Sequence, residues 1–283
     1  MSEKANILFI VEGERLEPEI IGRMAEVYGL QCKISSVRTN IHILYSLLKK
    51  DDGYSDVIPV LKEMLRKRLE SLGRGKTCAE TSAKIKRTRE DLEKLELSYS
   101  SVFLVFDGEF QHTEVKGLQT DDRIARNYCE LKEMFRFFDN ETEQGKLYVN
   151  YPMMESFRDC DDFFDNEFRD RFVSLDLLTK YKEIVSKRQL ARVHINSITQ
   201  QQFNKLVCMN VYKLNWPKSG KWRRMRYERF LETSKQASIL ELEYSFSKKL
   251  HAIAVLNTLL FFIIDYKGKD FYTKNIHENN ILS

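Results

Sequence analysis

Three carboxylates stand where the sequence could hold a catalytic metal ion. Glu12 follows the apolar run at residues 6–11, and Asp107 and Glu109 follow a second apolar run at 101–106. If the backbone stays extended there, Asp107 and Glu109 point to the same side, because side chains alternate along a strand. Mg²⁺ prefers hard oxygen ligands and keeps several waters, so two or three carboxylates can bind it. Such a centre can orient a phosphodiester, activate water and stabilise the leaving oxygen.

Strands alternating with helices must position these carboxylates. Apolar or β-branched runs predict strands at four places, and helical periodicity predicts helices between them. The strands are expected at 6–11, 32–37, 101–106 and 146–150, and the helices at 16–28, 41–50 and 121–138. This order predicts an α/β fold with a mostly parallel sheet and helices on both faces. Ligands of such sheets gather at the carboxyl ends of the strands, where the acidic motifs lie.

Two further segments complete the predicted organisation. Residues 59–97 are highly charged and predict a helical hairpin inserted into the α/β part, with a solvated arm as the competing interpretation. After residue 158 the pattern is mainly helical, with helices expected at 170–187, 199–211, 226–236 and 237–265. We therefore expect a catalytic α/β domain at 1–158 and a mainly helical C-terminal portion at 159–283.

Three short motifs resemble those of Toprim domains. Ile10-Val11-Glu12-Gly13-Glu14 is similar to the first Toprim motif, in which a strand ends in a glutamate followed by glycine. The segment 105–109 resembles the acidic pair motif, usually Asp-x-Asp, with Glu109 at the second acidic place. Asn150-Tyr-Pro-Met-Met-Glu155 resembles the Asn-Pro-x-x-Glu stretch of RloB-like proteins. The string at 11–18 is closest to RloB-like proteins and to Toprim domains of the OLD nuclease group.

The resemblance covers about residues 6–158 and implies a Mg²⁺-dependent Toprim nuclease, in which Mn²⁺ can substitute. Glu12 would face the metal as general acid or base, Asp107 and Glu109 would be ligands, and Glu155 would be a further ligand. Toprim nucleases of this kind often serve as toxic effectors of bacterial anti-phage defence, some of them with a separate ATPase that senses infection or inhibits the nuclease. The chain has no GxxxxGK[ST] phosphate loop, so such an ATPase would be a partner protein. A homodimer is also expected.

A basic stretch in the C-terminal portion is the candidate nucleic-acid surface. Residues 213–229 include seven basic side chains and one acidic side chain. Cations hold phosphates, and exposed indoles such as those of Trp216 and Trp222 can stack on unpaired bases. An equally favoured interpretation is a basic loop that its tryptophans anchor to the body of the protein. The candidate phosphate-binding residues are Lys213, Lys218, Lys221, Arg223, Arg224 and Arg226.

Composition sets the remaining limits. The 283 residues are 42% hydrophobic and 31% charged, which is enough for a buried core and a hydrated surface. No apolar run reaches the roughly 18 residues of a membrane-spanning helix, and residues 1–30 lack a signal-peptide pattern. A cytoplasmic protein without membrane contact is expected. The five cysteines lie far apart without a CxxC pair, which argues against a zinc site or disulfides.

Two other functions stay open from the sequence. One is a phosphodiesterase or phosphotransferase that acts on a small nucleotide with the same carboxylates. The other is a non-catalytic Toprim-like module that binds a partner protein. The sequence also leaves open whether a nuclease would cut DNA, tRNA or another RNA.

Overall fold

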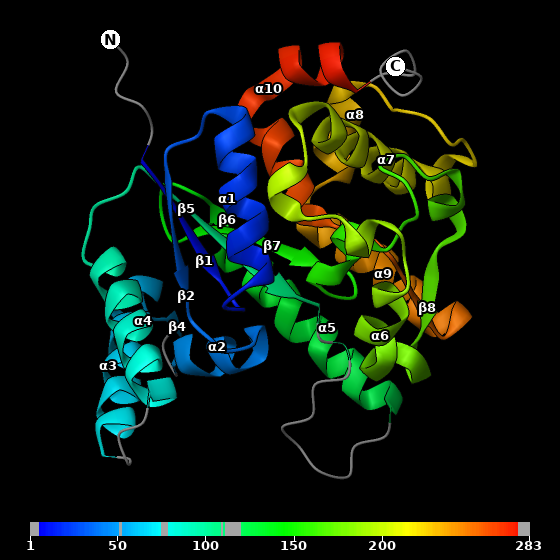
Figure 1. Cartoon of the computed structure of the whole chain (residues 1–283). Helices are drawn as coiled ribbons and strands as arrows, with labels where there is room; N and C mark the ends of the chain where they lie inside the picture. Colours follow the sequence, from blue (N-terminus) through cyan, green and yellow to red (C-terminus); the bar gives the residue numbers. More distant parts are fainter. Residues whose placement is uncertain (1–5, 51–52, 75–78, 109, 111–119, 277–283) are drawn as a thin grey trace. The chain divides into compact units, whose positions relative to one another are not determined.

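The computed structural model describes residues 6–50, 53–74, 79–108, 110 and 120–276 (Figure 1). Its backbone contacts divide the chain into two compact units. The first comprises residues 1–105 and 136–147, and the second comprises 106–135 and 148–283. The expected domain boundary at residue 158 stays a prediction.

The chain has an α/β fold built on a mostly parallel, five-stranded sheet with the order β2-β1-β5-β7-β6. Strand β1 pairs in parallel with β2 and with β5, and β6 pairs antiparallel with β7. All five residues of β1 are buried, as expected of a strand inside a parallel sheet. The strands are β1 (Ile7–Val11), β2 (Cys32–Ser36), β5 (Ser101–Asp107), β6 (Asp139–Asn140) and β7 (Gly145–Asn150).

The helices of the first unit follow the predicted pattern. In α1, Pro18 falls in the first turn, where its missing N–H is not needed, and Gly29 ends the helix in the left-handed conformation with φ 67°. In α2, the Asn40 side chain caps the helix by accepting the N–H of Ile43. The elements are α1 (Leu16–Tyr28), α2 (Ile41–Leu48), β3 (Lys49–Lys50), β4 (Gly53–Tyr54), α3 (Val57–Gly73) and α4 (Ala79–Leu95).

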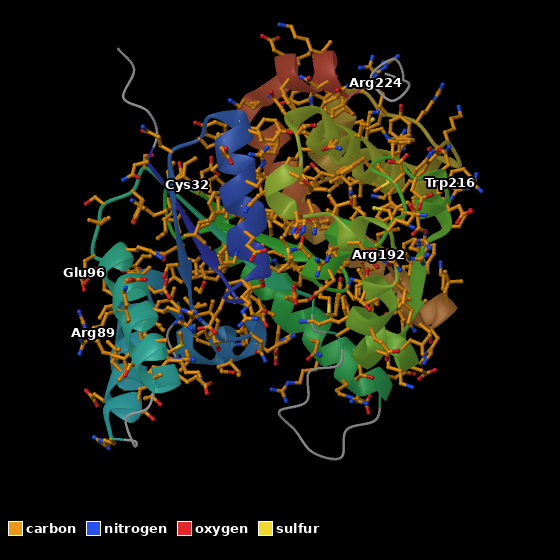
Figure 2. The ribbon with its side chains drawn as sticks, in the orientation of Figure 1. Cys32, Arg89, Glu96, Arg192, Trp216 and Arg224 are labelled. Atoms are coloured by element: carbon orange, nitrogen blue, oxygen red, sulfur yellow. The ribbon has the colours of Figure 1, made fainter. Side chains whose placement is uncertain are left out.

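The charged hairpin of α3 and α4 is joined to the sheet, so the interpretation as a solvated arm is wrong. The two helices lie side by side, and α4 packs on β2 (Figure 1). The hydroxyl of Ser35 donates to the carbonyl of Asp91 at 3.3 Å, and the N–H of Ser36 donates to the Asp91 carboxylate at 3.4 Å. At the end of the hairpin, Glu96, which is labelled in Figure 2, forms ion pairs with Lys62 and Arg66.

The second unit contains most of the remaining helices and a small antiparallel sheet of β8 and β9. The helix α5 (Thr120–Phe137) begins in this unit and ends in the first. The other elements are η1 (Met154–Arg158), η2 (Asn166–Asp170), β8 (Phe172–Ser174), η3 (Leu175–Lys180), α6 (Tyr181–Ser186), η4 (Leu190–Arg192), η5 (Ile195–Ser197), α7 (Gln200–Ser219), α8 (Tyr227–Thr233), α9 (Gln236–Leu250), β9 (Ala252–Ala254), η6 (Thr258–Leu260) and α10 (Phe261–Asn275).

Two of the helix predictions for this unit are wrong. The segment 170–187 contains strand β8 and short helical turns, and the segment 237–265 is divided by β9. His251 ends α9 in the left-handed conformation with φ 50°, and the chain then extends to pair with β8. The described residues include no helix that is long and apolar enough to cross a membrane.

Candidate functional site

Glu12 lies directly after β1, in a turn that backbone contacts define closely. Val11 pairs with Val105 in the sheet, and the N–H of Glu12 donates to the Val105 carbonyl at 3.3 Å. The next N–H, of Gly13, donates to the carboxylate of Glu17 at 3.0 Å. A Cβ atom at position 13 would lie 2.5 Å from a Glu17 oxygen, so a larger residue there would require the Glu17 side chain to shift. Glu17 is itself buried, which fixes the path of the chain beyond Glu12.

Arg38 supports the same turn from the segment that follows β2. Its N–H donates to the carbonyl of Glu12 at 3.0 Å, and its guanidinium donates to the carboxylate of Glu14. The same guanidinium binds Asp91 of α4 at 2.9 Å. The hydrogen bond from Arg38 is the main cause that lowers the pKa of Glu14. Arg38 has φ 57°, which is uncommon for a residue other than glycine, so its backbone is held by these contacts.

Asp107 is the last residue of β5, and the segment at 150–154 holds its carboxylate. One oxygen of Asp107, Oδ1, accepts the N–H of Met154 at 2.7 Å. The N–H of Gly108 lies 2.9 Å from the Asn150 carbonyl and 3.1 Å from the Pro152 carbonyl. A Cβ atom at position 108 would come within 3.1 Å of the Asn150 carbonyl oxygen, so glycine permits this close approach. The motif that resembles Asn-Pro-x-x-Glu therefore orients Asp107.

Asn257 fixes the 150–156 segment from the interior of the second unit. Its side-chain amide donates to the hydroxyl of Ser156 at 3.1 Å, and Asn257 is fully buried. The buried Asn150 accepts the N–H of Leu259 at 3.2 Å through its side-chain oxygen. Sequence reasoning missed Asn257, because it lies a hundred residues from its partner and no local motif marks it.

Glu155 has a carboxylate with two different environments. One oxygen, Oε1, forms an ion pair with Lys182 at 3.3 Å. The other, Oε2, is buried and has no hydrogen-bond partner within the described residues. A buried acceptor without a partner is costly, so this oxygen is suited to a cation or a donor that binds there.

The predicted metal-facing carboxylates fall in different parts of the structure. Glu12 belongs to the first unit, whereas Asp107 and Glu155 belong to the second. Glu109 lies outside the described residues. Among the residues that are described, no group of three or more His, Cys, Asp or Glu side chains is placed to hold a metal ion. The oxygen donors of Asp107 and Glu155 nevertheless fit Mg²⁺ in their chemistry.

The prediction that Lys213 binds phosphate at the surface is wrong. It lies in the buried part of α7 and is only 2% exposed. Its ammonium group donates to the carbonyls of Arg169 and Arg171 at 2.8 and 2.9 Å, and it lies 4.3 Å from the ring centre of Phe172. Burial lowers the pKa of Lys213 to about 7. Its donors are directed at the interior, away from any phosphate in solvent.

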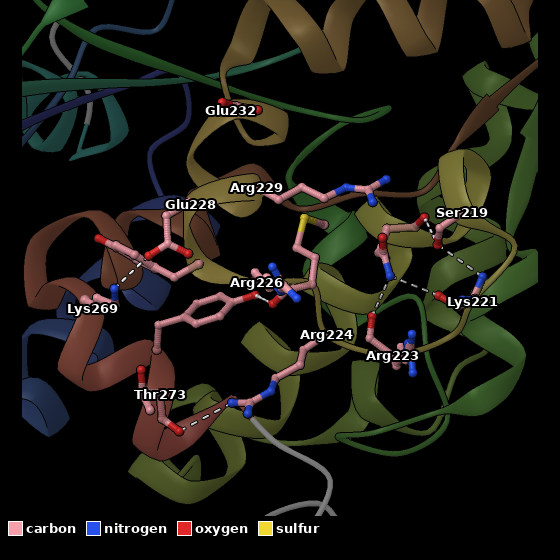
Figure 3. A pocket seen from close by; sticks show the side chains of 14 residues that line it. Ser219, Lys221, Arg223, Arg224, Arg226, Glu228, Arg229, Glu232, Lys269 and Thr273 are labelled. Atoms are coloured by element: carbon pink, nitrogen blue, oxygen red, sulfur yellow. Dashed lines mark hydrogen bonds and ion pairs between the residues drawn. The ribbon is translucent and has the colours of Figure 1, made fainter.

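Four of the other predicted basic residues line one surface hollow of about 1450 Å³ (Figure 3). The hollow lies among the end of α7, the connector at 220–226, α8 and α10. It has six basic and two acidic side chains in its lining. Lys218 is exposed on α7 and is not part of it. The basic members are the predicted Lys221, Arg223, Arg224 and Arg226, together with Arg229 and Lys269, which the sequence did not single out.

The basic side chains of this hollow differ in how they are held. Arg224 donates to the carbonyls of Thr273 and Ile276, at 3.4 and 3.0 Å, and so ties the connector to the end of α10. Lys269 forms an ion pair with Glu228 at 2.6 Å (Figure 3). In the part of the chain that the structure describes, no acidic partner pairs with the exposed side chains of Lys221, Arg223, Arg226 and Arg229.

The two tryptophans are engaged with the protein, as the second interpretation of the basic stretch expected. The guanidinium carbon of Arg169 lies 4.8 Å from the ring centre of Trp216. The indole N–H of Trp222 donates to Asn166 at 2.9 Å, and its ring packs edge-on against Tyr212 at 5.7 Å. Neither tryptophan lines the hollow.

Comparison with protein-family models, with curated proteins and with solved structures finds no match to this chain.

Proposed function

We propose that the chain is a metal-dependent endonuclease with a Toprim-like site, which cuts phosphodiester bonds of DNA or RNA, tRNA included. In this proposal it is the cytoplasmic toxic effector of an anti-phage defence system, acts as a homodimer, and works with a separate ATPase that senses infection or inhibits it. Mg²⁺ is the proposed cofactor, and Mn²⁺ can replace it.

The register of β1 and β5 is the observation that carries this proposal. The two strands run in parallel with Val11 opposite Val105, so both end at the same edge of the sheet. Glu12 follows the first strand and Asp107 ends the second. In parallel α/β sheets this edge is where ligands bind. Carboxylates that follow neighbouring parallel strands could supply the ligands of a metal site of the Toprim kind.

The residues around Asp107 would hold its carboxylate in a fixed orientation for metal binding. The N–H of Met154 holds one carboxylate oxygen of Asp107, which restricts the rotation of the side chain. Glu155 directly follows Met154 and offers its buried, unpartnered oxygen. When bound, Mg²⁺ would supply Lewis-acid stabilisation of negative charge on the phosphodiester. Glu12 is proposed to move the proton of the attacking water or the leaving oxygen.

Cleavage assays with neutral variants of the two carboxylates test the proposal. The purified protein would be incubated with plasmid DNA, single-stranded DNA and total tRNA, in Mg²⁺, Mn²⁺ or EDTA. We expect metal-dependent cutting that falls at least a hundredfold, as an order of magnitude, in Glu12→Gln and Asp107→Asn. Asp107→Asn keeps an oxygen for the N–H of Met154, so the fold should persist. Asp122→Asn, at an exposed position of α5, is the matched control and should cut normally.

Calorimetry with Mn²⁺ on the same proteins separates a missing activator from a wrong proposal. Binding that weakens in Asp107→Asn and persists in Asp122→Asn would support the metal site even if the isolated chain does not cut. If the wild-type protein neither binds the metal nor cuts any substrate, the catalytic proposal is wrong. The non-catalytic interaction module would then be the better interpretation.

A further inference from the structure

We propose that the hollow among α7, α8 and α10 binds the phosphodiester backbone of a nucleic acid strand and does not read its bases. This inference rests on the proposed function and makes it more specific. It places the backbone of that nucleic acid at a defined surface of the second unit. The residues that would carry it are Lys221, Arg223, Arg226 and Arg229.

The charge of the hollow is available to a ligand. An ion pair within the protein can neutralise an exposed cation, as Glu228 does for Lys269 at 2.6 Å. The four backbone-binding residues have no such partner among the described residues, so the cost of breaking an ion pair does not oppose phosphate binding. Arginine also presents a planar set of donors that matches a phosphate group.

The local folds that present these cations are firmly held. The side-chain amide of Asn215 donates to the carbonyls of Lys221 and Arg223 at 3.2 and 2.9 Å, and Asn215 is 4% exposed. The hydroxyl of the buried Tyr272 donates to the carbonyl of Met225 at 2.7 Å. The backbone of the connector is thus fixed on both sides, while its charged side chains face solvent (Figure 3). A preorganised set of cations loses less entropy when it binds.

The size and lining of the hollow favour a polymer over a small nucleotide. A volume of about 1450 Å³ exceeds the range of roughly 300–1000 Å³ that is usual for small-molecule sites. Small-molecule sites are also mainly apolar with a few polar groups, whereas charged side chains dominate here. Several unpaired cations spread over a wide surface are the usual arrangement for successive phosphates.

The aromatic residues of the basic stretch and of the hollow's lining argue against recognition of bases. Stacking on unpaired bases requires an exposed ring face. Trp216 and Trp222 are occupied by Arg169 and by Tyr212 with Asn166. Tyr272 is buried, and Tyr227 packs against it with ring centres 5.4 Å apart. Binding is therefore expected to depend on phosphates and to be insensitive to sequence.

Equilibrium binding in EDTA tests this inference without any cleavage. Fluorescence anisotropy would be measured with a short labelled DNA duplex, the corresponding single strand and an RNA of the same length, over a range of salt concentrations. For the duplex, four phosphate contacts predict that log K falls with log salt with a slope of about 3.6. Replacing Arg226 or Arg229 by alanine should lower that slope by about 0.9 each and weaken binding on the order of tenfold.

Lys218→Ala is the matched control. It removes an exposed cation from the same basic stretch but outside the hollow, and it should leave the slope and the affinity unchanged. Equal losses in Lys218→Ala and Arg229→Ala would mean a diffuse charge effect and would overturn the assignment, as would full affinity in the Arg226→Ala/Arg229→Ala double variant. Strong preference for one sequence would contradict backbone recognition. Normal binding by a protein that never cuts or binds metal would uphold this inference and reject the proposed nuclease.

Discussion

Two buried ionisable side chains of the second unit, Glu243 and Lys213, have pKa values that are shifted towards neutral pH. Glu243 is 1% exposed; its Oε2 accepts the N–H of Ala254 at 2.8 Å, whereas its Oε1 has no hydrogen-bond partner within the described residues. Burial raises the pKa of Glu243 to about 8 and lowers that of Lys213 to about 7. Both groups therefore change charge close to neutral pH, and stability should respond to pH there.

The pH dependence of folding should change when Glu243 can no longer ionise. The folded pKa of about 8 lies above the ordinary value of 4.5, so the folded state keeps a proton that the unfolded chain loses. The resulting stabilisation is complete below about pH 4.5 and is lost as the pH rises through about 8. Glu243→Gln cannot lose this proton and keeps an acceptor for Ala254. Relative to wild type, we expect its free energy of unfolding to improve between about pH 5 and about pH 9.

Chemical denaturation at these two pH values measures the effect. Glu241→Gln, at an exposed position of the same helix, is the control and should follow the wild-type pH dependence. If the difference between Glu243→Gln and wild type is the same at both pH values, Glu243 does not titrate in the way that its burial indicates.

At the scale of elements, the hairpin of α3 and α4 supports the turn that contains Glu12 through hydrogen bonds. Asp91 of α4 accepts hydrogen bonds from the Ser36 N–H and from Arg38, and Arg38 in turn holds Glu12 and Glu14. An insertion at 57–95 is thus connected to the proposed catalytic edge by one buried carboxylate. The hairpin accounts for the long separation between the first two acidic motifs.

Removing this carboxylate should loosen the turn. Asp91→Ala leaves the Arg38 guanidinium with one fewer acceptor and the Ser36 N–H without one, so we expect a loss of about 2 kcal/mol in the free energy of unfolding. Amide hydrogen exchange at residues 12–14 should accelerate, because the contact that holds Arg38 is gone. Exchange measured by mass spectrometry and denaturation by urea would test both effects.

Glu96→Ala provides the comparison for this variant. It breaks the exposed ion pairs with Lys62 and Arg66 at the end of the same hairpin and should leave exchange at 12–14 unchanged. Unchanged exchange at these residues in Asp91→Ala would show that the hairpin does not support the turn.

Elements with strong local patterns were the ones that the sequence could predict. The apolar runs in β1 and β5 predicted two inner strands of the sheet and the positions of Glu12 and Asp107, because such a run is a local property of the sequence. The end of α9 could not be predicted in the same way. His251 takes the left-handed conformation that glycine usually marks, and β9 then forms only because β8 lies opposite. A strand that forms only by pairing with a distant segment cannot be predicted from the local sequence pattern.

At the scale of the whole molecule, the net charge of +4 conceals a local concentration of basic side chains around the hollow. The basic stretch was visible in the sequence, but its members have different roles in the fold. Lys213 faces the interior, Lys218 lies outside the hollow, and Arg229 and Lys269 join it. A helix that is buried on most of its surface, as α7 is, gives no reliable periodicity for separating interior from exposed cations.

The hollow draws its lining from segments that lie some forty residues apart in the chain, and Arg224 joins them through the carbonyls of Thr273 and Ile276. Its cations have their mutual spacing only when α10 has packed against α7 and α8. Retention on a heparin column should therefore report whether the C-terminal helix has docked, and chromatography could separate correctly assembled molecules from those in which this last step has failed.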